Sequence, residues 1–266
     1  MLISLKHRCK PACLVLAVTL LSMANIGCSS HQGHAAAKTG ESATSDAATI
    51  SIQSPLASRG KLIFDQTPKY ASAYVGNKLS CNDCHIQSGT ADYAAPMIHL
   101  AGLFPMFNKR AGHVISLENR IQECFSRSEA GRPLPVESDE MHALVAYIDS
   151  LSRGGGKGKP YKGRGLVKLP SLEGDATAGK QVYVSQCASC HGTDGAGVPP
   201  VLPALWGPDS YNDGAGMNNP AKMAAFVIHN MPQNHPGTLT AQQAYDVSAF
   251  IHAMPRPQFN QAYKNY

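Results

Sequence analysis

The 266-residue chain has few charged residues, few aromatic residues and only one tryptophan. Charged side chains make up 15% of it, well below the roughly one quarter typical of globular proteins. This shortage, together with a formal net charge of only +5, excludes an acidic disordered chain and argues against a protein that binds nucleic acid. Hydrophobic residues make up 43%, which is enough for the core of one large or two small domains.

Cysteine is also too sparse for one class of protein. The chain has eight cysteines, far below the density of a disulfide scaffold, which exceeds about 8% in much shorter chains. The eight cysteines must therefore serve other purposes, such as targeting, covalent attachment and metal ligation. Eleven histidines accompany them.

The first 27 residues have the order of a secretory signal peptide. Three basic residues precede a mostly apolar run over residues 12–24, and no acidic residue occurs before Glu41. The run is too short for a membrane span, which needs about 20 residues. Cys9 and Cys13 would therefore leave with the signal, and the mature protein is expected in the periplasm.

Residues 25–30, NIGCSS, resemble a bacterial lipoprotein processing site, in which Cys28 would be lipidated and would anchor the protein to a membrane. Asn25 departs from the aliphatic residue usual in such sites, and residues 22–24 offer an ordinary cleavage site instead. Residues 28–52 contain almost no large apolar side chain and are predicted to form a flexible tether.

A second low-complexity segment, residues 154–170, is predicted to link two domains, residues 53–153 and 171–266. Between Arg153 and Lys168 the chain has six basic residues, six glycines and no acid. Without these six and the three basic residues of the signal, 14 basic residues remain against 18 acidic ones. The excess of positive charge therefore comes from the signal and the linker. A solvated connector is the simpler interpretation, and a docking site for an acidic partner is the alternative.

Each predicted domain contains one Cys-x-x-Cys-His motif, the attachment signal for a c-type haem. The motifs consist of Cys81, Cys84 and His85, and of Cys187, Cys190 and His191. Two thiols on one helical turn can add to the vinyl groups of a porphyrin, and the histidine then becomes the proximal iron ligand. Chance would yield the motif about 0.01 times in this chain, so two covalently attached haems c are expected. A redox dithiol or half of a zinc site is the alternative, but neither explains both histidines.

Amphipathic segments flank the two motifs at corresponding positions. Residues 58–64 and 138–151 lie on either side of the first motif, and residues 177–187 and 240–254 lie on either side of the second. No stretch of any length alternates with the period of a strand. The sequence predicts an all-α fold of two tandem cytochrome c-like domains joined by a basic, glycine-rich linker, with each haem between an N-terminal and a C-terminal helix.

The repeat indicates where the second ligand of each iron should come from. Met231 follows His191 by 40 residues and precedes a proline that turns the backbone. Ligation by histidine and methionine raises the reduction potential and suits electron transfer. Four other residues compete for this role: Met217, Met223, His229 and His235.

In the first domain the corresponding position, 39 residues after His85, is Cys124. No methionine is near this register, because Met97 and Met106 come too early and Met141 belongs to the last predicted helix. A lone cysteine is usually a small buried apolar residue, but Cys124 is the only cysteine after Cys28 that is outside the haem motifs. We therefore predict that the Cys124 thiolate ligates the first iron.

The residues around Cys124 suit an anion with several oxygens. A helix would place Arg120, Cys124 and Ser128 on one face, with Arg127 beside the thiol. Guanidinium groups meet such oxygens with paired, fixed donors, and Arg110 could supply another. The alternative is an ordinary surface helix with solvated charges, which accounts poorly for a cysteine at its centre.

With these motifs the sequence resembles the dihaem thiosulfate dehydrogenases over roughly residues 55–255. The most specific part is RIQECFSRS at residues 120–128, since Cys-x-x-Cys-His alone would fit any cytochrome c. The resemblance implies a catalytic His/Cys-ligated haem in the first domain, a His/Met-ligated electron-transfer haem in the second, and substrate binding by Arg110, Arg120 and Ser128. In some relatives a lysine before the methionine takes over the second iron. Here that residue is Asn230, so methionine alone is expected.

The family joins two thiosulfates into tetrathionate and releases two electrons, and some members run well in reverse. The resemblance therefore implies transfer from the first haem to the second and on to an external acceptor, such as a small cytochrome or a high-potential redox protein. Two alternatives are a dihaem electron-transfer cytochrome without its own substrate and a Cys-ligated oxidase that acts on carrier-bound sulfur. Cys124 and its arginines count against the first, and an assay with thiosulfate alone would separate the second.

Lipidation of Cys28 is directly testable. Labelled fatty acid should be incorporated into the wild-type protein but not into the Cys28→Ser variant, because the lipid is attached to the cysteine sulfur. The measurement is incorporation of label into the purified proteins, and equal incorporation in both would exclude a lipid anchor at this residue.

Overall fold

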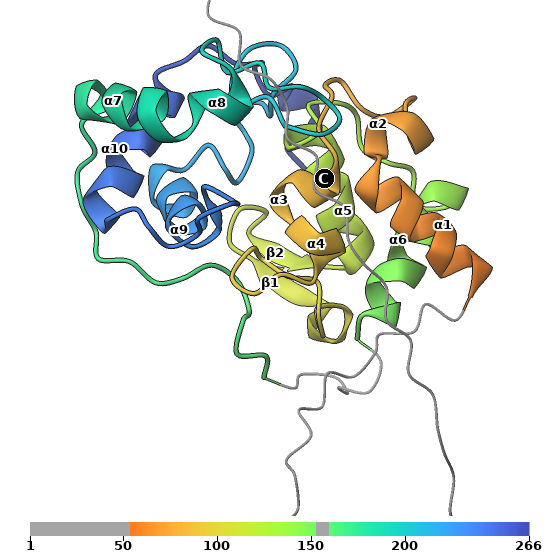
Figure 1. Ribbon diagram of the computed structural model, residues 1–266. Helices are drawn as coiled ribbons and strands as arrows, with labels where there is room; N and C mark the ends of the chain where they lie inside the picture. Colours follow the sequence, from red (N-terminus) through yellow and green to blue (C-terminus); the bar gives the residue numbers. More distant parts are fainter. Residues whose placement is uncertain (1–53, 153–159, 266) are drawn as a thin grey trace, which may run out of the picture. The chain divides into compact units, whose positions relative to one another are not determined.

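The computed structural model describes residues 54–152 and 160–265 (Figure 1). The predicted signal peptide, Cys28, the tether and residues 153–159 of the predicted linker lie outside the described residues. Within the described part of the chain, ten α-helices and two short strands account for nearly all regular structure. The predicted helical class is confirmed.

The helices before residue 153 form what we call the first bundle. They are α1 (Pro55–Asp65), α2 (Thr67–Tyr70), α3 (Cys81–Cys84), α4 (Ile86–Gly89), α5 (Leu117–Arg127) and α6 (Asp139–Ser150). The helices after residue 170 form the second bundle, and they are α7 (Ala176–Gln186), α8 (Ala188–His191), α9 (Pro220–Asn230) and α10 (Ala241–His252). Both bundles belong to one compact unit of the chain.

A small hairpin interrupts the helical pattern. Strand β1 (Met106–Asn108) pairs antiparallel with β2 (His113–Ile115), with Met106 opposite Ile115. The sequence showed no strand pattern here because three residues are too few for an alternation to stand out.

The long helices begin where capping residues predict. Ser138 accepts a hydrogen bond from the backbone N–H of Met141, and Thr240 forms a reciprocal capping box with Gln243. Asp175 caps α7 in the same way, through the N–H groups of Thr177 and Ala178. The predicted segments 58–64, 138–151, 177–187 and 240–254 therefore correspond to α1, α6, α7 and α10, with ends that differ by one to three residues.

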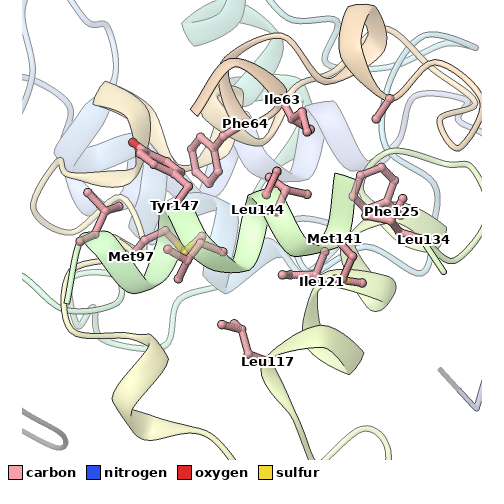
Figure 2. Close-up of a cluster of buried hydrophobic side chains, with 14 residues drawn as sticks. Ile63, Phe64, Met97, Leu117, Ile121, Phe125, Leu134, Met141, Leu144 and Tyr147 are labelled. Carbon is pink, nitrogen blue, oxygen red and sulfur yellow. The ribbon is translucent and has the colours of Figure 1, made fainter. Parts of the chain in front are cut away.

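The core of the first bundle is built around α6. Figure 2 shows Leu144 and Tyr147 of α6 beside Phe64 of α1, and Met141 beside Ile121 of α5. Each of these side chains is buried, which stabilises the fold by about 1.5–3 kcal/mol for a large apolar residue. This packing orients α5 relative to α1 and α6.

The first and last helices of each bundle contact each other directly. A Cβ atom on Gly60 of α1 would lie 1.9 Å from the backbone oxygen of Ala143 in α6, and one on Gly179 of α7 would lie 1.9 Å from that of Asp246 in α10. Such contact leaves no room for a porphyrin. The prediction that each haem lies between these two helices is therefore wrong, and the haem-attachment motifs lie beside the helix pairs.

The described part of the predicted linker contacts the first bundle. The N–H groups of Tyr93 and Ala95 donate to the backbone oxygens of Gly163 and Gly165, at 2.7 and 2.8 Å. From the second bundle, Phe226 of α9 packs with the buried side chains of the same loop, Ala91 and Ala94. This part of the linker is thus held against the loop of residues 91–95.

Among the described helices, none has the length and apolar character needed to cross a membrane.

The contact at Gly179 predicts an unusual sign for a substitution. Glycine to alanine within a helix ordinarily stabilises by roughly 0.5–1 kcal/mol, but Gly179→Ala should destabilise by about 1–3 kcal/mol because the new methyl group overlaps the backbone of α10. Denaturant unfolding of the holoprotein measures this. Gly216→Ala, at a position with open space around it, is the control, and equal effects at both positions would contradict the account.

Candidate functional site

Both haem-attachment histidines are held in the same way. His85 Nδ1–H donates to the backbone oxygen of Ala95 at 2.7 Å, and His191 Nδ1–H donates to that of Pro203 at 3.0 Å. Each bond leaves Nε2 with a free lone pair, which is the atom that would ligate an iron. Burial lowers the pKa of His85 to about 4 and also lowers the pKa of His191, so both rings stay neutral, as ligation requires.

The second motif opens onto an apolar pocket. Its lining includes Cys187, His191 and Met231, together with Val247 and Ile251 of α10. Leu79 and Cys84 of the first bundle also line it, so the pocket reaches the first motif. These residues fit a haem c, because a thiol and the neutral imidazole of the motif meet a thioether within an apolar enclosure.

Of the four residues that compete with Met231 for the second iron, two line its pocket and two do not. Met217 and Met223 line the same pocket as Met231, whereas His229 and His235 do not. His229 instead stacks edge-on against Tyr93. The side chain of Asn230 donates to the backbone oxygens of Phe226 and Tyr93 and is thereby held by protein groups.

The described cysteines lie in no disulfide and in no ready-made metal site of the protein alone. Within residues 54–152 and 160–265, no group of three or more His, Cys, Asp or Glu side chains is placed to hold a metal ion by itself. All five described cysteines are free thiols.

Three of the predicted first-site residues follow one another at steps of four along α5 and its C-terminal cap. Ser128 keeps helical backbone angles after Arg127, and its N–H donates to the backbone oxygen of Cys124. Arg120, Cys124 and Ser128 therefore share one helix face.

Cys124 is close enough to the first motif to interact with it electrostatically. Burial is the main reason that the pKa values of Cys81 and Cys84 are raised, and the Cys124 charge adds to the shift. Burial likewise lowers the pKa of His85 most, and the Arg120 charge adds to that effect. Burial is the main reason that the pKa of Cys124 itself is raised, and Arg120 opposes this effect most strongly. The thiol thus lies in a half-buried site with a guanidinium near it.

Glu123, which the sequence analysis did not single out, joins the two arginines. The Nη1 atom of Arg120 lies 3.3 Å from Glu123 Oε2, and Nη1 of Arg110 lies 3.8 Å from Oε1. Asn108 of β1 also donates to Oε2, at 2.9 Å. The Glu123 side chain is only 3% exposed, whereas those of Arg110 and Arg120 are 37% and 41% exposed. One buried carboxylate therefore holds two arginines whose outer donors face solvent.

Arg127 does not lie beside the thiol as predicted. Its guanidinium stacks 3.9 Å from the centre of the Phe259 ring, and Nη1 donates to the backbone oxygen of Gly214. Both partners belong to the segment that follows the linker. The interaction with an aromatic face explains why this arginine turns away, although its position in the helix would have allowed either direction.

Glu129 is a second residue that the sequence analysis missed. It is fully buried, and burial raises the pKa of its carboxyl group well above the usual value, with the Asp83 charge adding to the shift. Burial is the main cause of the raised pKa values of Cys81, Cys84 and Cys124, and a charge on Glu129 would add to it. The spacing of Arg120 and Glu123 at i, i+3 was a readable signal for Glu123, but nothing local marked Glu129 as buried.

Family models match the two halves of the chain separately. Residues 68–156 match the model described as "SoxA/TsdA, cytochrome c domain", and residues 174–251 match "Cytochrome C oxidase, cbb3-type, subunit III". Both halves therefore carry a cytochrome c domain, which binds haem c.

Curated relatives match along most of the chain. A thiosulfate dehydrogenase of Stutzerimonas stutzeri (strain A1501) is 39% identical over 209 residues, which cover 76% of this chain and 68% of the relative. One of Allochromatium vinosum is 38% identical over 213 residues, covering 76% of this chain and 79% of the relative. The chain belongs to the thiosulfate dehydrogenase family.

A solved structure of the family agrees with the fold. The thiosulfate dehydrogenase (TsdBA) of Marichromatium purpuratum superimposes with a TM-score of 0.74 at 33% identity, over 79% of this chain and 48% of the other. The present chain thus spans about half the length of that protein. The prediction of two tandem cytochrome c-like domains is confirmed, as is the resemblance to the thiosulfate dehydrogenase family.

Proposed function

We propose that this chain oxidises two thiosulfates to one tetrathionate at Cys124, in a reaction that can also run in reverse. The observation that carries the proposal is the cluster of Cys124, Arg120 and Arg110 beside the first haem-attachment motif. Membership of the thiosulfate dehydrogenase family supports it. A cytochrome that only carries electrons would have no use for a half-buried thiol flanked by arginines.

The arginines address the main electrostatic difficulty of the reaction. Two dianions must approach until their outer sulfurs can bond, and their mutual repulsion is strong in a dry site. Arg120 and Arg110 point partly exposed donors outward, and guanidinium forks match sulfonate oxygens. Ser128, on the same helix face as Cys124, would add a hydroxyl donor. Fixed positive groups of this kind offset repulsion without reorganising during the reaction.

Two haems c would complete the site, held by Cys81, Cys84, His85 and Cys124, and by Cys187, Cys190, His191 and Met231. When bound, they supply one-electron acceptance, so that the two electrons released per tetrathionate pass from the Cys-ligated haem to the Met-ligated haem and on to an external acceptor. A small cytochrome or another high-potential redox protein fits that acceptor. With a signal peptide at residues 1–27, the reaction would take place in the periplasm, with Cys28 as a lipid anchor.

Cys124 has two roles open to it. It can act only as an iron ligand, whose thiolate lowers the reduction potential. Alternatively, its thiolate forms a bond to the outer sulfur of one thiosulfate as two electrons leave. The second thiosulfate then attacks that outer sulfur, tetrathionate departs and the thiolate is restored. Both roles require the sulfur atom of Cys124.

The proposal is tested by assaying the purified protein in both directions. Thiosulfate with an artificial electron acceptor should yield tetrathionate, and tetrathionate with an artificial donor should yield thiosulfate. The ratio of the two rates gives the preferred direction. No turnover with thiosulfate alone, but turnover when a sulfur-carrying protein is added, would favour the oxidase that acts on carrier-bound sulfur.

Cys124→Ala should keep both haems and lose tetrathionate formation, by about a thousandfold or more. The haems stay because their attachment uses other cysteines, and activity is lost because both roles of Cys124 need its sulfur. Haem content and initial rate with thiosulfate are the measurements. Near wild-type turnover in this variant would reject Cys124 as the centre of the reaction.

Glu123→Gln should raise the KM for thiosulfate by about tenfold while changing kcat less. The variant keeps the shape of the side chain but removes the charge that holds Arg110 and Arg120, so the arginines lose their fixed geometry. Glu118→Gln, on the same helix but outside this ion-pair cluster, is the matched control. A KM that stays at the wild-type value, or that falls, would show that Glu123 does not position the arginines for the substrate.

A further inference from the structure

The last turn of α5, which carries Cys124, obtains some of its hydrogen bonds from outside its own bundle. A helix leaves its last four backbone oxygens without intrahelical partners, and here these belong to residues 125–128. Local turns account for the oxygen of Phe125, which accepts from Gly131 N–H at 2.9 Å, and partly for that of Arg127, which accepts from Ala130 N–H at 3.3 Å. The remaining bonds come from two asparagine side chains and one backbone N–H.

Asn212 of the second bundle provides two of these bonds. Its side-chain Nδ2 donates to the oxygen of Ser126 at 2.9 Å, and its backbone N–H donates to the oxygen of Arg127 at 3.2 Å. Its Oδ1 accepts from Gly214 N–H at 3.1 Å, which fixes the amide so that Nδ2 faces α5. Asn212 is 2% exposed and Ser126 is 1% exposed, so water does not compete for these groups.

Asn77 links the same helix end to the second bundle from the other side. Its Nδ2 donates both to the oxygen of Ser128, at 2.8 Å, and to the oxygen of Ser210, at 3.0 Å. The stacking of Arg127 on Phe259 adds a third connection at this point. The second bundle therefore closes the end of the helix on which the thiol sits.

We infer that Asn212 is a positioning residue for Cys124. The inference rests on the proposed role of Cys124. The Ser126 and Arg127 oxygens belong to the same turn as Cys124. Asn212 donates hydrogen bonds to both oxygens and therefore fixes the position of that turn. The location of the thiol relative to His85 thus depends on contact with the electron-accepting domain. Removing the amide leaves a buried oxygen without a donor, and the turn must shift to find another.

A residue that merely holds the two bundles together would behave differently. Its loss would weaken the whole contact and would affect both haems alike. A residue that positions Cys124 should alter the first haem selectively, because α5 carries no ligand of the second. The electron paramagnetic resonance spectrum of the oxidised holoprotein separates these cases, since thiolate-ligated and methionine-ligated haems give distinct signals.

The experiment compares Asn212→Ala with Asn218→Ala in the full-length holoprotein. Asn218 is a matched control: it lies in the same loop, and its side-chain amide also donates to a backbone oxygen, that of Asp213, within the second bundle. We expect Asn212→Ala to shift or split the thiolate-ligated signal, leave the methionine-ligated signal unchanged and lower thiosulfate turnover by about tenfold to a hundredfold. Asn218→Ala should match the wild type in all three.

Asn212→Asp provides a second variant if the alanine variant loses haem. It keeps the acceptor for Gly214 N–H but replaces the donor that faces Ser126, so the same selective shift is expected. Wild-type spectra and turnover in the Asn212 variants, or a parallel decline of both haem signals, would overturn the inference. If Cys124→Ala itself leaves the spectrum and turnover of the wild type, the proposed function fails instead, whatever the Asn212 variants do.

Discussion

Burial of the inner face of α5 is the constraint on which the rest of the site depends. Ile121 and Phe125 pack into the core of the first bundle with side chains of α6, and this contact fixes the rotation of a helix only eleven residues long. With that face committed, the helical period leaves Arg120, Cys124 and Ser128 on another face. Rotating the helix by one residue would bury Arg120 and expose the Phe125 ring. The packing of the core and the geometry of the candidate site therefore require the same rotation of α5.

The candidate site combines partly exposed positive charge with a buried carboxylate. Glu123 is buried between the two arginines and is paired with both, which avoids the large cost of an isolated buried charge. Because the carboxylate lies behind the guanidinium groups, it can hold them without blocking their outer donors. Two dianions would meet a preorganised site of this kind without first having to move its charges.

The two bundles show how one fold serves two purposes. Both have a pair of long helices in direct backbone contact and a histidine held by its Nδ1 atom. At the ligand register they differ: Met231 faces an apolar pocket, whereas Cys124 has Arg120 beside it. An apolar surrounding suits a centre that only transfers electrons, while a charged one suits a centre that binds an anion. The shared helix pair supports both, because its direct backbone contact keeps the haem-attachment motif of each bundle beside the pair.

The sequence by itself determined what depends on residues close together along the chain. The haem motifs, the capped helices and the shared face of Arg120, Cys124 and Ser128 all follow from spacings of a few residues. The tertiary structure alone decided the contacts between distant segments: Asn108 with Glu123, Arg127 with Phe259, and Asn212 with Ser126. Helical periodicity says which residues share a face but not which other segment packs there. For that reason Arg127 was predicted beside the thiol and is found against the second bundle.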